Sequence, residues 1–433
     1  MPTPRDDVAH LLRRAGFGGT VAQIDTLATT QDLTTIVDDL LNFSGAPADT
    51  PPAGLTDPAV SSGQRYLNLI WWWYDRMATT TKPLQEKLTF FWHGHFCSED
   101  RDVGSQQLMY QQNALYRANC AGNFRTFTKA MSIEPAMLRY LNNETNRVGK
   151  VQENFARELW ELFMLGVDNY TQDEVVESAR AWTGHGLNSA RDTYSFNPSR
   201  HDNGNKTIFG QTANFDGPGV IDWTLDGPKG TICARYIVTK LWKFFANTNP
   251  TSTVIDTLAA TFQSSWDIAA TVRQLLLMPE FYAPECKGQL VRSPVEYMAA
   301  AIKLTGVPAA TARPDSYHVN MNQELLNPPD VSGWKSNGYW ISSAAYWARA
   351  AFAKNIANKA KDAGVLAGTN LLSVNQAVDA AIAQFGLTSP STTTVNAMRS
   401  WLTAERSASG YSAVTEQVNL MVLVLLSPDF NIA

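Results

Sequence analysis

Apolar residues recur along the chain at offsets of three and four, the spacing that lines one face of an α-helix. This pattern predicts helices over residues 10–14, 21–28, 33–41, 66–77, 84–95, 234–245, 254–262, 269–277, 294–304, 344–363, 395–404 and 415–426. A capping box, Thr171 with Glu174, begins a further helix that runs through Trp182. No regular array of alternating strand segments is present. We therefore expect a mostly α-helical fold.

Two long stretches, residues 187–230 and 307–343, interrupt the predicted helices. Both are rich in Asn, Asp, Gly, Pro and aromatic residues, and long irregular loops in a compact domain usually carry function. Thr, Phe, Ile and Val within 194–224 favour short strands or a β-hairpin there. We expect one mostly helical domain over residues 1–433, with an N-terminal helical subregion at 1–45 and loop insertions at 187–230 and 307–343.

The composition excludes some classes of protein. Hydrophobic residues make up 44% of the 433 residues and charged residues 17%, which is typical of a globular protein. A net charge of −5 gives no basic footprint for nucleic acid. No run of eighteen apolar residues is present, so we expect no transmembrane segment. The first residues lead into an amphipathic helix, and no signal peptide is visible in the chain.

The four cysteines, Cys97, Cys120, Cys233 and Cys286, lie far apart and form no Cys-x-x-Cys pair. This spacing argues against a structural zinc site and favours buried thiols, with one or two disulfides left open if the protein is exported. The chain also has 13 Trp. Such residues fill cores, and they also stack on the apolar faces of ligands.

The segment 152–163 is the most informative, because its helical spacing separates an apolar stripe from a polar face. Asn154, Arg157, Glu158 and Glu161 share the polar face. Glu158 and Glu161 lie one turn apart, and paired carboxylates serve glycoside hydrolysis and metal binding. The structural alternative is an ion pair between Arg157 and one of these carboxylates.

His93 and His95 close a strongly aromatic helix. They converge only if the helix ends near Gly94, where they would form a metal-ligand or acid/base pair. The alternative is two core histidines. In the first long stretch, His201 and Asp202 precede a Gly turn, and this pair either orients a general base or belongs to a solvated turn.

The stretch 327–341 combines two prolines, Asp330, Gly333, Trp334 and Trp340. The prolines stiffen this stretch, and Gly333 permits a tight turn beside Trp334. The stretch therefore either presents aromatic rings to a ligand or packs Trp334 into the core. Farther upstream, Ser293 and Pro294 are typical of the start of a helix. The preceding Arg292 has no such structural role, so it is a candidate binding residue.

These motifs together resemble a bacterial family catalogued as domain of unknown function 1800. The resemblance rests on residues 9–18, 91–96, 153–166, 170–175, 179–184, 201–206, 293–296 and 328–334. The motifs fall on polar groups that core packing does not require, namely His93, His95, Asn154, Arg157, Glu158, His201 and Asp202. Genes of this family often lie beside a gene for a secreted sulfatase-like or alkaline-phosphatase-like protein. The resemblance therefore implies an extracellular or periplasmic setting, without a reaction.

Three functional hypotheses follow. The first is a hydrolase of an extracellular glycan or glycoconjugate, with catalytic residues Glu158, Glu161, His201, Asp202 and His95 and substrate-binding residues His93, Asn154, Arg157, Arg292, Asp330, Trp334 and Trp340. The second is an enzyme that uses a divalent metal, redox or hydrolytic, with candidate ligands His93, His95, Glu158 and His201. The third is a non-catalytic partner of the sulfatase-like protein. The first predicts that these residues converge on one buried site.

Overall fold

Helices make up most of the structure, a computed structural model that describes residues 3–433. The predicted mostly α-helical fold is confirmed. The helices are α1 (Arg5–Arg14), α2 (Val21–Thr30), α3 (Leu33–Leu41), α4 (Ser62–Thr79), α5 (Pro83–His95), α6 (Asp100–Val103), α7 (Gln106–Asn119), α8 (Phe124–Ser132), α9 (Pro135–Tyr140), α10 (Asn154–Glu158), α11 (Gln172–Ala181), α12 (Gly217–Asp226), α13 (Gly230–Phe245), α14 (Ser252–Ser265), α15 (Ile268–Leu277), α16 (Pro294–Thr305), α17 (Ala309–Ala312), α18 (Ser343–Asp362), α19 (Val374–Gln384), α20 (Thr392–Ser407), α21 (Ala413–Leu426) and α22 (Pro428–Asn431).

Local sequence signals explain where several helices begin. Thr171 and Glu174 form the expected capping box at the start of α11, with the side chain of each bonded to the backbone N–H of the other. Ser293 and Glu296 do the same for α16, which has Pro294 in its first turn. Each cap supplies a partner for backbone N–H groups that the helix itself leaves unbonded.

The stretch 187–230 contains the short strands that its sequence favours, and also a helix that its sequence does not indicate. Strands β1 (His185–Leu187) and β2 (Tyr194–Phe196) pair antiparallel, as do β3 (Lys206–Ile208) and β4 (Gln211–Ala213). Helix α12 then occupies the end of the stretch 187–230, so the expectation of an irregular loop is wrong there. The stretch 307–343 contains α17 and a short 3₁₀ turn at Asn337–Trp340 but is otherwise irregular, as expected.

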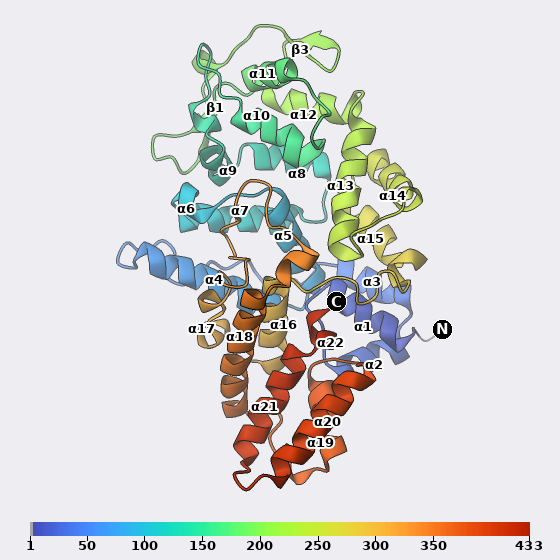
Figure 1. Cartoon of the computed structure of the whole chain (residues 1–433). Helices are drawn as coiled ribbons and strands as arrows, with labels where there is room; N and C mark the ends of the chain where they lie inside the picture. Colours follow the sequence, from blue (N-terminus) through green and yellow to red (C-terminus); the bar gives the residue numbers. More distant parts are fainter. Residues whose placement is uncertain (1–2) are drawn as a thin grey trace.

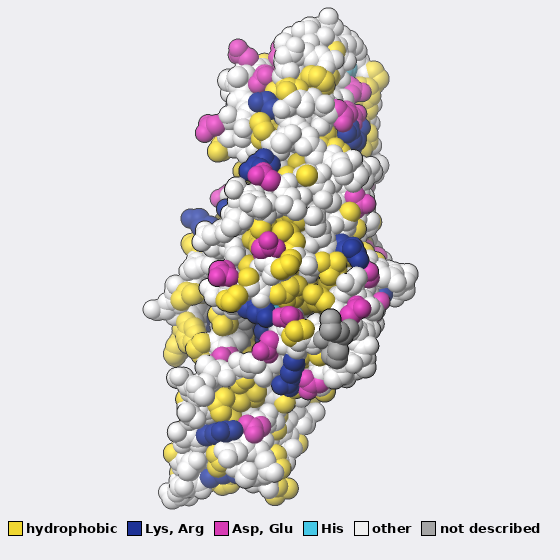
Figure 2. All heavy atoms as spheres, turned by 90° about the vertical axis from the view of Figure 1, so that its right-hand side faces the viewer, with side chains coloured by type: hydrophobic (Ala, Val, Ile, Leu, Met, Phe, Trp, Pro, Cys, Tyr) yellow, Lys and Arg dark blue, Asp and Glu magenta, His cyan; other side chains and the backbone are white. Residues whose placement is uncertain are grey.

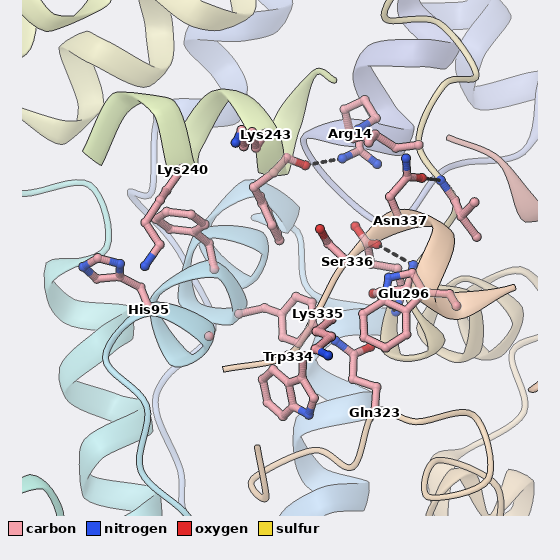
Figure 3. A pocket seen from close by; sticks show the side chains of 18 of the residues that line it. Arg14, His95, Lys240, Lys243, Glu296, Gln323, Trp334, Lys335, Ser336 and Asn337 are labelled. Atoms are coloured by element: carbon pink, nitrogen blue, oxygen red, sulfur yellow. Dashed lines mark hydrogen bonds between the residues drawn. The ribbon is translucent and has the colours of Figure 1, made fainter. Parts of the chain in front are cut away.

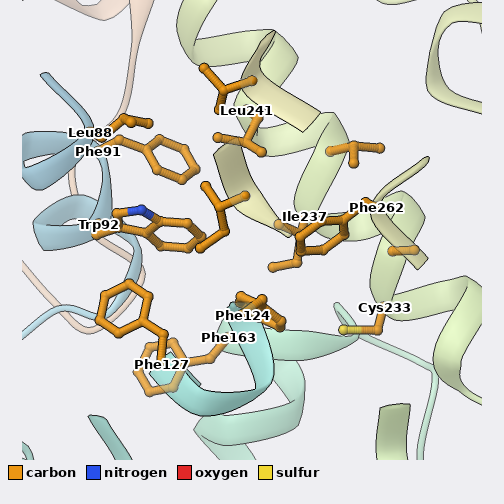
Figure 4. Packing of buried hydrophobic residues seen from close by; sticks show 14 of the residues in the cluster. Leu88, Phe91, Trp92, Phe124, Phe127, Phe163, Cys233, Ile237, Leu241 and Phe262 are labelled. Atoms are coloured by element: carbon orange, nitrogen blue, oxygen red, sulfur yellow. The ribbon is translucent and has the colours of Figure 1, made fainter. Parts of the chain in front are cut away.

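Two adjoining hydrophobic cores hold the helices together. The first lies among α1–α3, α5 and α7–α15, and Figure 4 shows Trp92 of α5 packed there beside side chains of α8 and α13. The rings of Trp92 and Phe127 meet edge to face with centroids 5.2 Å apart. The second lies mainly among α4 and α16–α22, with contributions from α5–α7 and α9, and extends from the middle of Figure 1 to its lower end. Burial of one large side chain contributes about 1.5–3 kcal/mol, so these cores dominate stability.

The core interpretation holds for five of the tryptophans, which have less than 2% of their surface exposed: Trp73, Trp92, Trp160, Trp182 and Trp242. All four cysteines are buried and unbridged, as the sequence favoured. Within residues 3–433, no helix is long and apolar enough to cross a membrane. On the face seen in Figure 2, acidic and basic side chains are interspersed and form no continuous basic stripe.

Three contacts hold together the region where α1, α5, α13 and α16 meet, at the boundary of the two cores. Lys87 of α5 forms a buried ion pair with Glu296 of α16. The side chain of Arg14, at the end of α1, donates hydrogen bonds to carbonyl groups at the end of α13. The segment 326–340 then lies across α5, with the Trp334 ring 3.8 Å from the position a Gly94 Cβ would take. This junction encloses a cavity.

Candidate functional site

A cavity of about 270 Å³ opens between α1, α5, α13, α16 and the segment 323–340. Figure 3 shows His95 and Lys240 at one end of it, Arg14 and Asn337 at the other, and Trp334 and Lys335 between them. Each wall comes from a different part of the sequence, so the cavity exists only in the folded chain.

Positive charge dominates this cavity. Arg14, Lys240, Lys243 and Lys335 line it, whereas Glu296 is the one acidic residue among its lining residues. In the chain from residue 3 to residue 433, none of the four basic side chains takes part in an ion pair, and Glu296 is already paired with Lys87. The cavity therefore carries uncompensated positive charge, which attracts anions.

Arg14 is the most constrained of these cations. Its Nε donates to the carbonyl oxygen of Phe245 over 2.8 Å, and a second nitrogen donates to the carbonyl oxygen of Phe244. The third nitrogen, Nη1, is buried and has no partner, although the residue is only 2% exposed. A buried guanidinium with a free donor is costly unless an anion or water satisfies it.

Lys240 lies at the opposite end of the cavity and is half-buried. Its Nζ donates to the carbonyl oxygen of Leu162 over 3.1 Å and lies 5.1 Å from the centre of the Tyr236 ring. Burial lowers the pKa of Lys240 to about 8. The amine therefore remains charged at neutral pH, with a weaker hold on its proton than a surface lysine.

Glu296 forms part of the cavity floor, with 8% of its surface exposed. Burial alone would raise its pKa, but Lys87, Arg14 and the backbone at Ser293 outweigh that effect and lower the pKa to about 2. Glu296 is thus ionised throughout the physiological range. Glu296 is paired with Lys87 and also interacts with Arg14, so Lys240, Lys243 and Lys335 have no counter-charge among the lining residues.

Aromatic side chains form the remaining wall: Phe90, Phe91, Phe244, Trp334 and Trp340. The rings of Phe91 and Phe244 have centroids 5.2 Å apart, and those of Phe90 and Trp334 6.2 Å. The turn before Trp334 depends on Gly333, whose φ is +83°. A Cβ at this position would lie 2.5 Å from the carbonyl oxygen of Gly94, so the close approach of the two backbones requires glycine here.

His95 connects the cavity to the predicted helix. That helix is α-helical over α10 and continues as a π-helix from Leu159 to Met164, which leaves carbonyl groups free for outside donors. The His95 Nε2 lies 3.0 Å from the carbonyl oxygen of Phe163. Because a carbonyl only accepts, Nε2 carries the proton and Nδ1 is an acceptor, which is buried and has no partner in the described chain. Burial holds the pKa of His95 well below its usual range.

The Glu158 and Glu161 carboxylates lie outside the cavity. Both residues are half-buried, and the Tyr170 hydroxyl donates to Glu161. Burial, followed by the negative charges of Glu161 and Asp330, raises the pKa of Glu158. The Asp330 carboxylate accepts a hydrogen bond of 2.8 Å from the Ser332 backbone.

Arg157 does not lock either carboxylate of that pair. Its guanidinium forms an ion pair with Glu153 at 3.1 Å and donates to Gln172 over 2.6 Å. Asn154 is exposed and makes only a long contact of 3.5 Å with the carbonyl oxygen of Leu141. On the polar face predicted for this helix, Arg157 and Asn154 therefore make local contacts, and neither binds the carboxylate pair.

His201 and Asp202 belong to a different part of the molecule. Asp202 forms an ion pair of 2.8 Å with Arg180 of α11, which lowers the pKa of the carboxyl group. The His201 Nδ1 lies 2.8 Å from the carbonyl oxygen of Thr183. Neither residue lines the cavity. The structure thus ties this pair to α11 and the hairpins, and the expected convergence with His95 does not occur.

His93 and Arg292 are buried beside the cavity and do not line it. The His93 ring meets the Trp334 ring with centroids 5.2 Å apart, and burial lowers its pKa to about 3. Arg292 stacks on Phe430 at 4.4 Å, where burial lowers its pKa to about 9. Of the proposed residues, the cavity therefore gathers His95, Trp334 and Trp340.

The proposed metal ligands His93, His95, Glu158 and His201 do not come together at one site. Within residues 3–433, no group of three or more His, Cys, Asp and Glu side chains is placed to hold a metal ion. His93 faces Trp334, whereas His95 bonds to the π-helix. His93 and His95 thus do not form a ligand pair, and the structure offers no binding set for a divalent metal in the chain it describes.

Sequence reasoning missed the cations that define the cavity: Arg14, Lys240, Lys243 and Lys335. On α13, Lys240 and Lys243 look like ordinary basic residues of an amphipathic helix, whose long side chains reach solvent. The Arg13–Arg14 pair in the packed helix α1 was the one available signal, because one of two adjacent residues must turn towards the core.

The chain belongs to the family described as a protein of unknown function, DUF1800, whose model matches residues 10–432. The match extends over nearly the whole chain and confirms the resemblance seen in the sequence motifs. Comparison with the curated proteins and with the solved structures gave no match. The family description assigns no activity, so a functional proposal depends on the geometry of the site.

Proposed function

We propose that this member of the DUF1800 family binds a small acidic saccharide, one that carries a carboxylate or sulfate group, in the cavity between α5, α13 and α16. One observation carries the proposal: four basic side chains line the cavity, and its single carboxylate is already paired with Lys87. An acidic ligand would supply the missing counter-charge. The buried, unpartnered Nη1 of Arg14 is a ready donor for it.

The aromatic wall supports a ligand that also has an apolar face. Sugar rings present C–H groups on one side and hydroxyl groups at the edge, and aromatic rings pack against such faces. Trp334 is half-buried and offers a ring at the cavity. Gln323 and Asn337 add neutral donors and acceptors for hydroxyl groups.

The size of the cavity sets the size of the ligand. Pockets for drug-sized molecules have volumes of about 300–1,000 Å³. At about 270 Å³, this cavity is slightly smaller than that range. It therefore accommodates one sugar unit, or two at most, of any longer chain.

A thermal-shift comparison tests the proposal. Glucuronate and glucose differ in the carboxylate, so glucuronate should raise the melting temperature and glucose should not, because binding to the folded state stabilises it. The Lys240→Met and Lys243→Met variants should lose this shift. Lys359→Met, an exposed lysine on α18, is the matched control and should keep it. Equal shifts with both sugars would contradict the charge argument.

A second candidate function, glycan hydrolysis, is favoured by the environment of Glu158. Burial and its acidic neighbours raise the pKa of this carboxyl group, which is the property of a general acid, and Glu161 lies one turn away as a carboxylate partner. The Glu158→Gln variant should then fold normally and lose turnover of an acidic oligosaccharide. Unchanged turnover, or misfolding of Glu158→Gln and Glu161→Gln alike, would exclude a catalytic pair.

A further inference from the structure

The segment that closes the cavity also presents an unusual exposed surface. Three aromatic residues and one isoleucine are strongly exposed here, and we call them together the aromatic platform. The exposed fractions are 49% for Tyr339, 66% for Ile341, 46% for Tyr346 and 77% for Trp347. Large apolar side chains are normally scattered singly over a surface, and a group of them marks an interaction site.

The packing of α18 explains why these side chains point outward. The helix buries Ala345, Ala348 and Phe352, so Tyr346 and Trp347 fall outside its packed face. The Tyr346 hydroxyl donates to the carbonyl oxygen of Leu426 over 2.5 Å, which holds this ring in place. Tyr346 and Trp347 are therefore part of the first turns of an ordered helix.

The platform is continuous with the cavity along the chain. Lys335, Ser336, Asn337 and Trp340 line the cavity, whereas Tyr339 and Ile341, their neighbours, face outward. The Lys335 Nζ lies 5.2 Å from the centre of the Tyr339 ring, so the nearest cation of the cavity touches the platform. A ligand that extends from the cavity past Lys335 meets these rings next.

The chemistry around the platform favours sugars over a protein partner. Residues 336–347 contain no charged side chain, and the four residues between Ile341 and Tyr346 are two Ser and two Ala. Such small side chains leave ring faces open and supply hydroxyl groups, whereas Ser and Ala are depleted in protein–protein interfaces.

We infer that an acidic polysaccharide chain is the ligand, with one charged unit in the cavity and the following units stacked on Tyr339, Tyr346 and Trp347. This inference rests on the proposed function and extends it from a small acidic sugar to a polymer. The cations of the cavity favour a ligand that carries negative charge. The aromatic platform favours a long ligand, because only a chain of several sugar units reaches both the cavity and the platform.

The test compares galacturonate with a galacturonate hexamer by calorimetric titration. Trp347→Ala should weaken binding of the hexamer about fivefold to tenfold, the worth of one aromatic contact, and leave binding of the monomer unchanged. Trp347→Phe keeps a ring and should restore most of the hexamer affinity. Leu371→Ala removes a side chain that is 84% exposed far along the chain and is the matched control.

Each contrary result has a distinct meaning. If Trp347→Ala binds the hexamer as tightly as the wild type does, the platform inference is wrong while the cavity proposal stands. If the wild type binds neither monomer nor hexamer, the proposed function itself fails. If the wild type is a dimer in sedimentation and Trp347→Ala is a monomer, the platform is a contact between two copies of the chain, and the polysaccharide inference is overturned.

Discussion

Glu296 and Lys87 form a buried ion pair between α16 and α5, directly beneath the cavity. Lys87 also donates to the carbonyl oxygen of Gly16 over 3.1 Å, so the amine has two acceptors. The pair joins the two hydrophobic cores, and it neutralises the one carboxylate that lines the cavity. It thereby leaves Arg14, Lys240 and Lys243 free to face an anion.

Removing one partner of this pair should be strongly destabilising. Glu296→Gln retains a capping residue for α16 but leaves the charge of Lys87 buried without a partner. Such a change lowers the free energy of unfolding by about 3–5 kcal/mol. Urea denaturation measures the loss. Glu174→Gln makes the same change in the capping box of α11, where no ion pair is present, and should cost less than about 1 kcal/mol. Equal losses would show that the ion pair contributes nothing.

The turn at Gly333 should tolerate no side chain. In Gly333→Ala, the new Cβ would meet the carbonyl oxygen of Gly94 at 2.5 Å, with the backbone held at a φ of +83°. We expect a loss of about 2 kcal/mol or more and a change in Trp334 fluorescence, because the turn places that ring. Gly338→Ala, in the same segment, has no atom within 4 Å of the added Cβ and should be neutral. A stable Gly333→Ala variant would contradict the close packing of this segment on α5.

Buried neutral histidines should make the protein sensitive to mild acid. Burial lowers the pKa of His10 and His93 to about 3 and that of His185 to about 4. The unfolded chain binds these protons below about pH 6.5, whereas the folded chain does not, so stability is complete above pH 6.5 and falls as the pH decreases towards 4.

The expected slope is about 1.4 kcal/mol per pH unit for each histidine, and at least about 4 kcal/mol in total, because burial also lowers the pKa of His95 and His318. Urea denaturation at pH 7, 6 and 5 measures it. The His93→Asn variant should reduce the slope by about 1.4 kcal/mol per pH unit, the contribution of one histidine. An unchanged slope in this variant would mean that His93 is protonated in the folded protein.

Local signals in the sequence predict the fold well, because helix starts and apolar stripes involve neighbours along the chain. The capping residues Thr171 and Ser293 begin helices where expected, and Phe155, Leu159 and Phe163 bury the predicted stripe. The change to a π-helix at Leu159 was not predictable, because outside donors such as His95 stabilise its free carbonyl groups.

The candidate site was predicted only in part, because long-range partners decide which polar residues are free. Asp202 is occupied by Arg180, and Arg157 by Glu153. Conversely, Lys240 and Arg14 belong to helices with ordinary patterns, and only the packing of α13 against α1 and α5 turns them towards one cavity. The sequence identified Trp334 and His95 at this cavity but gave no indication of its charge.

Binding of the acidic ligand should depend on the protonation of Lys240. Burial lowers the pKa of this amine to about 8, so its positive charge is present below pH 8 and disappears as the pH rises through that value. Affinity for galacturonate should therefore decrease between pH 7 and 9. Lys240→Met should bind more weakly at pH 7 and lose most of this decrease, and calorimetric titration at pH 7, 8 and 9 measures both effects. A wild-type affinity that is constant over this range would exclude Lys240 from the site.

The most direct test of the acidic-saccharide cavity is a calorimetric titration of galacturonate and galactose into the wild type and Lys243→Met at pH 7. The two sugars differ in one carboxylate, which is the group that the cations of the cavity are expected to hold. We predict that the wild type binds galacturonate at least about tenfold more tightly than galactose, since one charged hydrogen-bonded contact is worth about 1.5–3 kcal/mol. Lys243→Met should reduce that preference, and added salt should weaken it. Equal affinity for the two sugars, or a preference that survives Lys243→Met unchanged, would contradict the account.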